Sequence, residues 1–267
     1  MPTTRPWQRM MILALAGLLA AACGGGPSGP AEGTPPRERP APSPAAGAPA
    51  PPAPRGSATI TGTVRYVGEV PPLNPIKMDA DPGCAKKHGS AVPSEVLVLG
   101  ENNAVANVFV QVKGGLPAGS YPTPGEAAVL DQDGCRYSPH VLGVMVGQRL
   151  RILNSDGLLH NVHALPKINK AFNMAMPATR TEAEVTFAQE ESMFMIKCDV
   201  HPWMGAYVAV IAHPYFHVTQ ADGRFSLSGL PAGRYDVEAW HEKLGLRTES
   251  VELTDGQTAQ IDFTLTR

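Results

Sequence analysis

Short stretches in which apolar and polar residues alternate recur along most of this chain. Alternation with a period of two is typical of a β-strand that buries one face. Glycine, proline, asparagine and aspartate separate the stretches, as expected for the turns of antiparallel sheets. No segment has the longer period of an amphipathic helix, so the pattern predicts an all-β sandwich or barrel. The strands are expected within residues 58–68, 106–115, 142–154, 183–189, 192–198, 205–212, 223–240 and 249–265.

One segment shows neither a strand period nor a helix period. Residues 165–180, LPKINKAFNMAMPATR, are therefore expected to form a long loop. Loops of this length in compact domains often carry function.

The first 22 residues have the composition of an export signal. Arg5 and Arg9 precede the apolar run MMILALAGLLAAA, which is too short for a permanent membrane span. Small residues, Cys23 and a glycine-rich stretch follow, and this sequence resembles a bacterial lipoprotein signal. The resemblance implies cleavage before Cys23, lipid attachment to its sulfur, and a location in the cell envelope of a bacterium, on the periplasmic or surface side. The alternative is an ordinary secretory signal with an incidental cysteine.

Residues 23–56 are rich in proline, glycine and alanine and have no apolar periodicity. Such a segment cannot bury enough surface to offset its ordering entropy. We expect a tether of up to roughly 100 Å between the lipid anchor and a folded part that begins near Ser57.

A cysteine, two histidines and a methionine are the strongest chemical signal in the chain. KCDVHPWM (197–204) places Cys198, His201 and Met204 at intervals of three after an apolar strand, and His160 follows another strand and a turn. A thiolate with two imidazoles suits copper in both oxidation states, and a thioether is a weak, soft fourth ligand. The set predicts one mononuclear copper ion. The alternative is that Cys198 is a core thiol or a disulfide partner.

The segment around these residues resembles the cupredoxins, the plastocyanin-like family of mononuclear blue-copper proteins. VLDQDGCRYSPHVLGVMVGQRLRILNSDGLLHNV is similar to the opening strands of that family, and MFMIKCDVHPWMGAYVAV is similar to its ligand loop and last strand. The resemblance covers residues 127–212 and implies a Greek-key sandwich over residues 116–212, in which Asn161 steadies the ligand loop. The copper ligands that it implies are His160, Cys198, His201 and Met204. The spacing from His201 to Met204 is shorter than in plastocyanin, which leaves the colour and the reduction potential open.

The last fifty residues resemble the second half of a carboxypeptidase-regulatory-like (transthyretin-like) β-sandwich. Residues 218–265 contain strands joined by LPAG and TDGQ turns, and GTVRYVGEVPP (62–72) and VANVFVQVKGG (105–115) resemble the first half of such a module. We therefore expect residues 57–115 and 213–267 to form one sandwich that is interrupted by the copper domain.

The four cysteines suggest one disulfide. If Cys23 carries lipid and Cys198 binds copper, Cys84 and Cys135 remain as a pair, and an exported protein permits a disulfide between them. The alternative is that Cys198 pairs with one of the two and that no metal binds.

The other histidines and methionines are expected to be structural. His163 would face the opposite side of a strand from His160. Trp203 is either a core residue or part of an apolar docking surface beside His201. The methionines are expected to fill the core or loops rather than bind Cu(I). The residues concerned are His88, His140, His213, His217 and His241, together with Met174, Met176, Met193 and Met195.

The leading functional hypothesis is electron transfer between redox protein partners by a membrane-tethered copper protein, with the exposed edge of His201 as the exit. Copper storage or delivery that uses the loop of Met174 and Met176 is the second hypothesis, and a non-redox surface module with a degenerate site is the third. No enzymatic activity and no catalytic residue are expected, because only one ligand set and no hydrolase motif occur. The chain has 22 basic and 24 acidic residues, which does not favour nucleic-acid binding.

Overall fold

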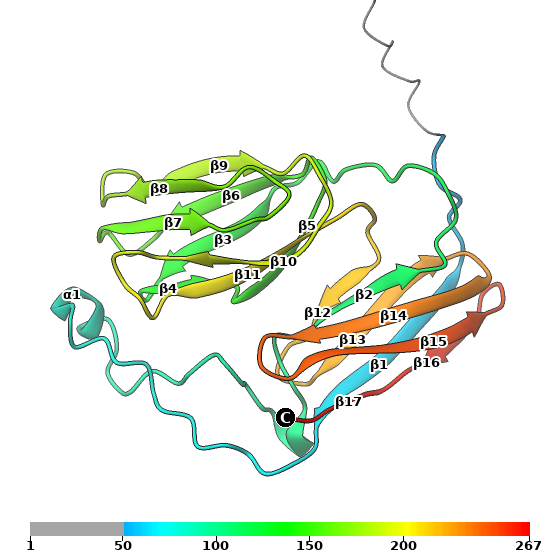
Figure 1. Cartoon of the computed structure of the whole chain (residues 1–267), viewed down its shortest axis with the longest axis horizontal. Coiled ribbons are helices and arrows are strands. Elements are labelled where there is room, and N and C mark those ends of the chain that lie inside the picture. Colours follow the sequence, from blue (N-terminus) through cyan, green and yellow to red (C-terminus); the bar gives the residue numbers. More distant parts are fainter. Residues whose placement is uncertain (1–50) are drawn as a thin grey trace, which may run out of the picture. The chain divides into compact units, whose positions relative to one another are not determined.

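The computed structural model describes residues 51–267, which form two β-sandwiches with very little helix (Figure 1). The all-β prediction is confirmed. The predicted signal peptide (1–22), Cys23 and most of the linker lie outside the described residues. Within residues 51–267 no helix is long and apolar enough to cross a membrane.

The central sandwich consists of strands β3 to β11, arranged in two sheets with the orders β4-β3-β6-β9 and β5-β11-β10-β7-β8. Within these sheets β3 runs parallel to β6, and β5 runs parallel to β11. Alternate residues, such as Leu150 and Ile152, face the core between the sheets. The strands are β3 (Ala128–Asp133), β4 (Arg136–Ser138), β5 (Val141–Met145), β6 (Arg149–Asn154), β7 (His160–Ala164), β8 (Phe172–Met176), β9 (Glu182–Thr186), β10 (Glu191–Lys197) and β11 (Gly205–Ile211).

The second sandwich, here called the split sandwich, draws its strands from both sides of the central one. β1 (Ala58–Tyr66) pairs with β13 (Arg224–Leu230), β16 (Thr258–Gln260) and β17 (Phe263–Leu265). β2 (Phe109–Gly114) pairs with β12 (Phe216–Val218) and β14 (Gly233–His241), and β14 also pairs with β15 (Gly245–Leu253). Strands from residues 57–115 therefore pair with strands from residues 213–267.

The prediction of a structureless loop over residues 165–180 is wrong in part. This segment contains β8, which pairs with β7 from Ala164↔Phe172 to His160↔Met176. Phe172, Met174 and Met176 face the core of the central sandwich, while the residues between them are exposed. The alternation spans only five residues, and methionine and asparagine are weak strand signals, so the period was too short to recognise.

A long connection between β1 and β2 crosses to the other sandwich. Residues 76–92, here called the cap segment, lie within the range expected for the split sandwich but pack on the core of the central one through Met78, Cys84 and Val92. The cap segment contains the single-turn helix α1 (Pro82–Ala85), whose N-cap is Asp81. The short 3-10 helix Glu101–Asn103 follows before the chain enters β2.

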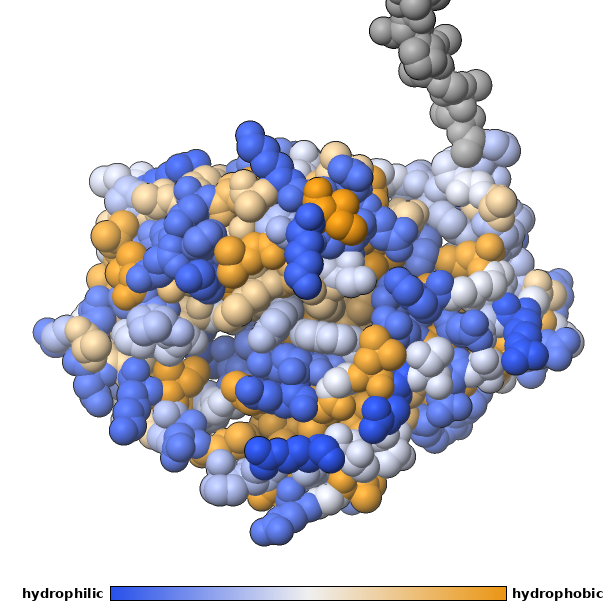
Figure 2. All heavy atoms as spheres, in the orientation of Figure 1, coloured by the Kyte–Doolittle hydropathy of each residue, from blue (hydrophilic) through white to orange (hydrophobic). Residues whose placement is uncertain are grey.

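The two sandwiches meet through apolar side chains, with Phe109 and Ile211 in one buried cluster. Gly143 of β5 lies against this cluster, where an added Cβ would come within 2.5 Å of the ring of Phe216 and 2.8 Å of the ring of Phe109. The close approach therefore depends on the absence of a side chain at Gly143. On the face of the molecule seen in Figure 2, apolar side chains lie scattered among polar ones.

A partly buried ion pair joins the sandwiches. His140 Nε2 lies 2.5 Å from Glu242 Oε1, and His140 Nδ1 lies 3.0 Å from the carbonyl oxygen of Gly205. Burial lowers the pKa of His140, but the hydrogen bond and charge of Glu242 and the charge of Glu95 outweigh it, so that the pKa is raised. Protonated His140 therefore donates from both ring nitrogens.

This ion pair predicts a pH dependence of stability. A histidine with a raised pKa in the folded state contributes stability that is complete below its unfolded pKa of about 6.5 and is lost as the pH rises through the folded value. We expect the free energy of unfolding of the wild type, measured by urea titrations at a series of pH values, to fall as the pH rises through this range. The Glu242→Gln variant should show a smaller fall. An equal fall in both proteins would contradict the assignment.

Candidate metal centre

Three predicted ligands come from neighbouring strand ends of the central sandwich. His160 is the first residue of β7, Cys198 directly follows β10, and His201 lies in the turn between β10 and β11. β7 and β10 are adjacent and antiparallel, so this arrangement places His160 beside the turn. The turn is closed by backbone bonds from Cys198 N to Met204 O (3.2 Å) and from Met204 N to His201 O (3.0 Å). The backbone N–H of His201 also donates to Cys198 Sγ at 3.3 Å.

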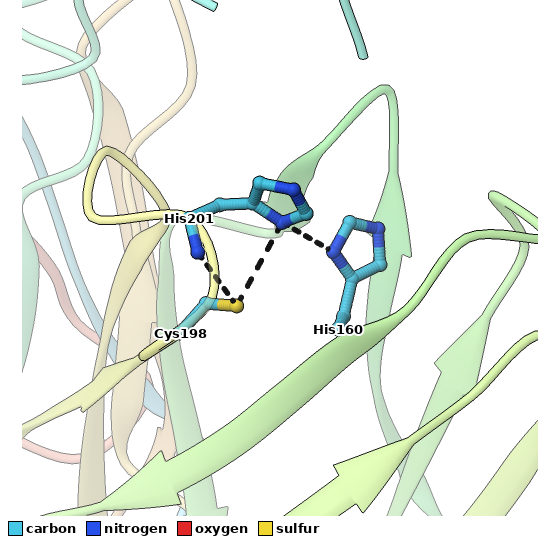
Figure 3. Close-up of side chains that lie close together, drawn as sticks. All are labelled: His160, Cys198 and His201. Carbon is cyan, nitrogen blue, oxygen red and sulfur yellow. Dashed lines mark hydrogen bonds between the residues drawn. The ribbon is translucent and has the colours of Figure 1, made fainter. Parts of the chain in front are cut away.

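The donor atoms of these side chains converge (Figure 3). The Nδ1 atoms of His160 and His201 are 2.9 Å apart, and Cys198 Sγ is 3.9 Å from His201 Nδ1. All three residues are at least 98% buried, and one atom from each lies within 4.8 Å of the others. Two imidazole nitrogens and one sulfur atom therefore face a common point.

The outer nitrogens of both rings contact carboxylates. His160 Nε2 lies 2.8 Å from Asp156 Oδ2, and His201 Nε2 lies 3.0 Å from Asp81 Oδ2. A carboxylate only accepts hydrogen bonds, so each Nε2 carries a proton. In the neutral ring, Nδ1 is then unprotonated and its lone pair can bind a metal ion. Two nitrogen lone pairs 2.9 Å apart repel each other unless a proton or a cation lies between them. The donor set thus fits a metal ion.

The groups around Cys198 ease deprotonation of its thiol. Burial lowers the pKa of His160, but hydrogen bonds with Asp156 and Cys198 outweigh it and raise the pKa to about 9. Burial raises the pKa of Cys198, but the hydrogen bond with His160 and backbone N–H groups outweigh it, and the net shift is downward. A deprotonated sulfur is the form that binds metals.

Met204 and Asn161 lie beside this set. The Met204 side chain is buried in the same core cluster as Cys198. Asn161 Oδ1 accepts from the backbone N–H of Asp199, and its Nδ2 donates to Asn173 Oδ1 and Asp199 Oδ2. Asn161 thus links β7 to the ligand turn, which is the role that the cupredoxin resemblance implies.

His163 does not join the donor set. It is partly exposed, and its Nδ1 lies 2.9 Å from Asp199 Oδ2. His160 and His163 thus lie in different environments, as expected for opposite faces of a strand. Met174 and Met176 contribute to the core, where Met176 Sδ accepts a bond from Gln132 Nε2.

The cap segment covers the outer side of the histidines. The predicted disulfide between Cys84 and Cys135 is confirmed, with an S–S distance of 2.05 Å, and Cys84 Sγ lies 3.6 Å from His201 Nε2. Two further contacts attach the cap segment to the central sandwich. They are the ion pair of Lys87 Nζ with Asp156 Oδ1 (3.0 Å) and the hydrogen bond of His88 Nε2 with Gly134 O (2.8 Å). The disulfide also removes its two cysteines as thiolate ligands.

The expectation of an exposed His201 edge is wrong, because this residue is 2% exposed and Asp81 bonds to its outer nitrogen. Trp203, which is partly exposed, lies beside it, with ring centroids 5.0 Å apart. The indole N–H of Trp203 donates to the carbonyl oxygen of Cys135 at 3.1 Å. Trp203 therefore connects the ligand turn both to the disulfide and to the surface.

Sequence reasoning did not identify Asp81 and Asp156. Asp81 is 120 positions from His201, and no local pattern connects the two. Asp156 lies four residues before His160 in the sequence NSDG, which reads as a turn. The sequence contains one weak signal for each aspartate. Asp156 is close to the candidate ligand His160, and Asp81 begins the Asp-Pro-Gly-Cys sequence that ends at the predicted disulfide cysteine Cys84.

One family model and several solved structures are similar to parts of this chain. Residues 200–266 match the carboxypeptidase regulatory-like domain, and this match begins in the ligand turn and includes β11 of the central sandwich. No curated protein matches the chain.

Solved structures that match include a Cu(I) form of a mutant amicyanin at 22% identity, covering 38% of this chain and 97% of that chain with a TM-score of 0.29. A purple cupredoxin from Nitrosopumilus maritimus matches at 25% identity, covering 31% of this chain and 98% of that chain with a TM-score of 0.27. A Cu-containing nitrite reductase from Thermus scotoductus matches at 17% identity, covering 36% of this chain and 25% of that chain with a TM-score of 0.30.

Proposed function

We propose that this chain is a mononuclear copper protein that carries single electrons between redox protein partners. The observation that supports the proposal is the convergence of two imidazole Nδ1 atoms and one thiol sulfur, all buried, at adjacent strand ends. A thiolate with two imidazoles is the donor set of mononuclear electron-transfer copper sites, and the Met204 thioether would be a weak fourth ligand. Copper bound there would supply a one-electron couple.

The surrounding residues hold the donor atoms in place. Asn161 ties the ligand turn to β7, the backbone bonds close the turn, and the disulfide fastens the cap segment over the histidines. Donor atoms that are fixed in this way need not move when the charge at their centre changes. The cap segment covers the outer side of His201 through Asp81 and the disulfide, which favours electron transfer over catalysis on a bound substrate.

Trp203 is the proposed exit for the electron, because it is the aromatic side chain that contacts His201 and is also partly exposed. Leu159 and Val200, which adjoin two of the ligands in sequence, are 51% and 45% exposed. Exposed apolar side chains of this kind suit brief contact with a redox partner. The proposed location is the cell envelope, where the lipid anchor at Cys23 would tether the protein.

Replacement of Trp203 tests this route. We expect Trp203→Leu to slow electron self-exchange between the Cu(I) and Cu(II) forms several-fold, because the variant lacks the ring next to His201. Trp203→Phe should slow it less, and neither variant should change the copper content. The rates come from NMR line widths in mixtures of the two forms. A Trp203→Leu rate equal to that of the wild type would contradict the route.

Voltammetry tests the function as a whole. The copper-loaded protein should give a reversible one-electron wave and should lose Cu(I) only slowly to a chelator. If no wave appears and the chelator removes Cu(I) within the mixing time, the protein would instead handle copper by storage or delivery.

A further inference from the structure

We propose that Asp81 and Asp156 are positioning residues for the two histidine ligands. Each carboxylate holds the Nε2 proton of one ring, so that both rings present Nδ1 to the metal and donate more strongly to Cu(II). This inference rests on the proposed copper site. The two aspartates would influence the reduction potential in addition to the metal ligands, and no sequence pattern indicates them.

Asp156 is fully held by its surroundings. Its side chain is completely buried, and Oδ2 accepts from His160 Nε2 and from the backbone N–H of Cys135, each at 2.8 Å. Oδ1 accepts from the backbone N–H of Gly134 at 2.8 Å and from Lys87 Nζ at 3.0 Å. A buried carboxylate with four donors has no freedom to turn away, so the ring plane of His160 is fixed.

Asp81 performs the same task from the cap segment. Its Oδ1 accepts from the backbone N–H groups of Gly83 and Cys84, which leaves Oδ2 directed at His201 Nε2. The neighbouring disulfide anchors this turn to Cys135. The side chain of Asp81 is 35% exposed, so its negative charge is better screened by solvent than that of Asp156.

The electronic consequence follows from the charge of the acceptors. A carboxylate that accepts the outer N–H of a metal-bound histidine increases the basicity of the ligating nitrogen, and loss of such an outer partner typically lowers metal affinity roughly 10–100-fold. A more basic nitrogen and a nearby negative charge both favour Cu(II) over Cu(I). The two aspartates should therefore lower the reduction potential.

The experiment compares Asp81→Asn, Asp156→Asn and the double variant with Asp133→Asn, which removes a carboxylate from the end of β3 without a described contact to either histidine. We expect the potential of the copper-loaded protein to rise in each single variant, more for Asp156→Asn than for Asp81→Asn, and most in the double variant. Cu(II) affinity should fall roughly 10–100-fold. Potentials shifted no more than in Asp133→Asn would overturn the proposal.

A second readout needs no metal. In the metal-free wild type, the Nε2–H protons of His160 and His201 should give slowly exchanging, downfield NMR signals, and each Asn variant should lose the signal of its own histidine. Absence of these signals from the wild type would overturn the proposal. A wild-type chain that binds no copper would refute the proposed function, while the Nε2–H signals would still decide the positioning role. If Asp156→Asn fails to fold, the more exposed Asp81→Asn supplies both readouts.

Discussion

Cys198→Ser is expected to abolish the visible absorption of the Cu(II)-loaded protein and to weaken copper binding by more than the roughly 10–100-fold that is typical for loss of an outer-shell partner. Cys198 Sγ is the one free thiol in the described part of the chain, and a thiolate-to-copper transition requires a thiolate. A hydroxyl at this position is a harder and much weaker ligand. Isothermal titration and absorption spectroscopy of the two proteins measure the effect.

The matched control is Met174→Leu, which replaces another sulfur-containing residue of the same core. Met174 packs in the core cluster and belongs to the methionine pair that a copper-delivery protein would use. We expect this variant to retain wild-type copper affinity and spectrum. Unchanged absorption in Cys198→Ser would refute the ligand assignment, and loss of affinity in Met174→Leu would favour the delivery function.

The Cys84→Ser/Cys135→Ser variant is expected to lose about 4 kcal/mol of stability on the chain-entropy model, because the disulfide closes a loop between cysteines 51 residues apart. The cap segment would then be held over the histidines by non-covalent contacts alone. These are the contacts of Asp81 with His201, Lys87 with Asp156 and His88 with Gly134, together with the apolar packing of the cap segment on the core. We expect a Cu(I) chelator to extract copper faster from this variant. Urea unfolding and chelator kinetics measure the two effects.

A reductant provides the control for this prediction. Reduction of the disulfide in the copper-loaded wild type should raise its extraction rate to that of the double variant, and the double variant should not respond to the reductant. Equal extraction rates in the oxidised wild type and the double variant would show that the cap segment does not limit access to the site.

The strands could be predicted because half-buried strands leave a period of two in the sequence. That period predicted strands at β1, β10 and β14. In β14, for example, the alternating residues Tyr235, Val237 and Ala239 are all buried in the structure. The short strand β8 was missed, because five residues do not establish a period. The cap segment could not be predicted, because residues 76–92 have no period and their packing is decided by contacts distant in sequence.

The candidate ligands could be predicted because Cys198, His201 and Met204 are close in sequence and carry their chemistry in their residue types. Their surroundings could not be predicted in the same way. The sequence gives no indication that a segment about 120 positions earlier buries His201 or that Asp81 bonds to it. The same limit explains the incorrect expectation of an exposed His201 edge. Long-range contacts of single polar residues leave no periodic pattern to read.

The most direct test of the account is a titration of the purified, metal-free protein with Cu(II), followed by optical and EPR spectroscopy. The account predicts an intense visible thiolate-to-copper band that saturates at one equivalent, together with the EPR signal of a single Cu(II) ion. A protein that develops no such band, or that saturates at a different stoichiometry, would contradict a mononuclear copper centre at His160, Cys198 and His201.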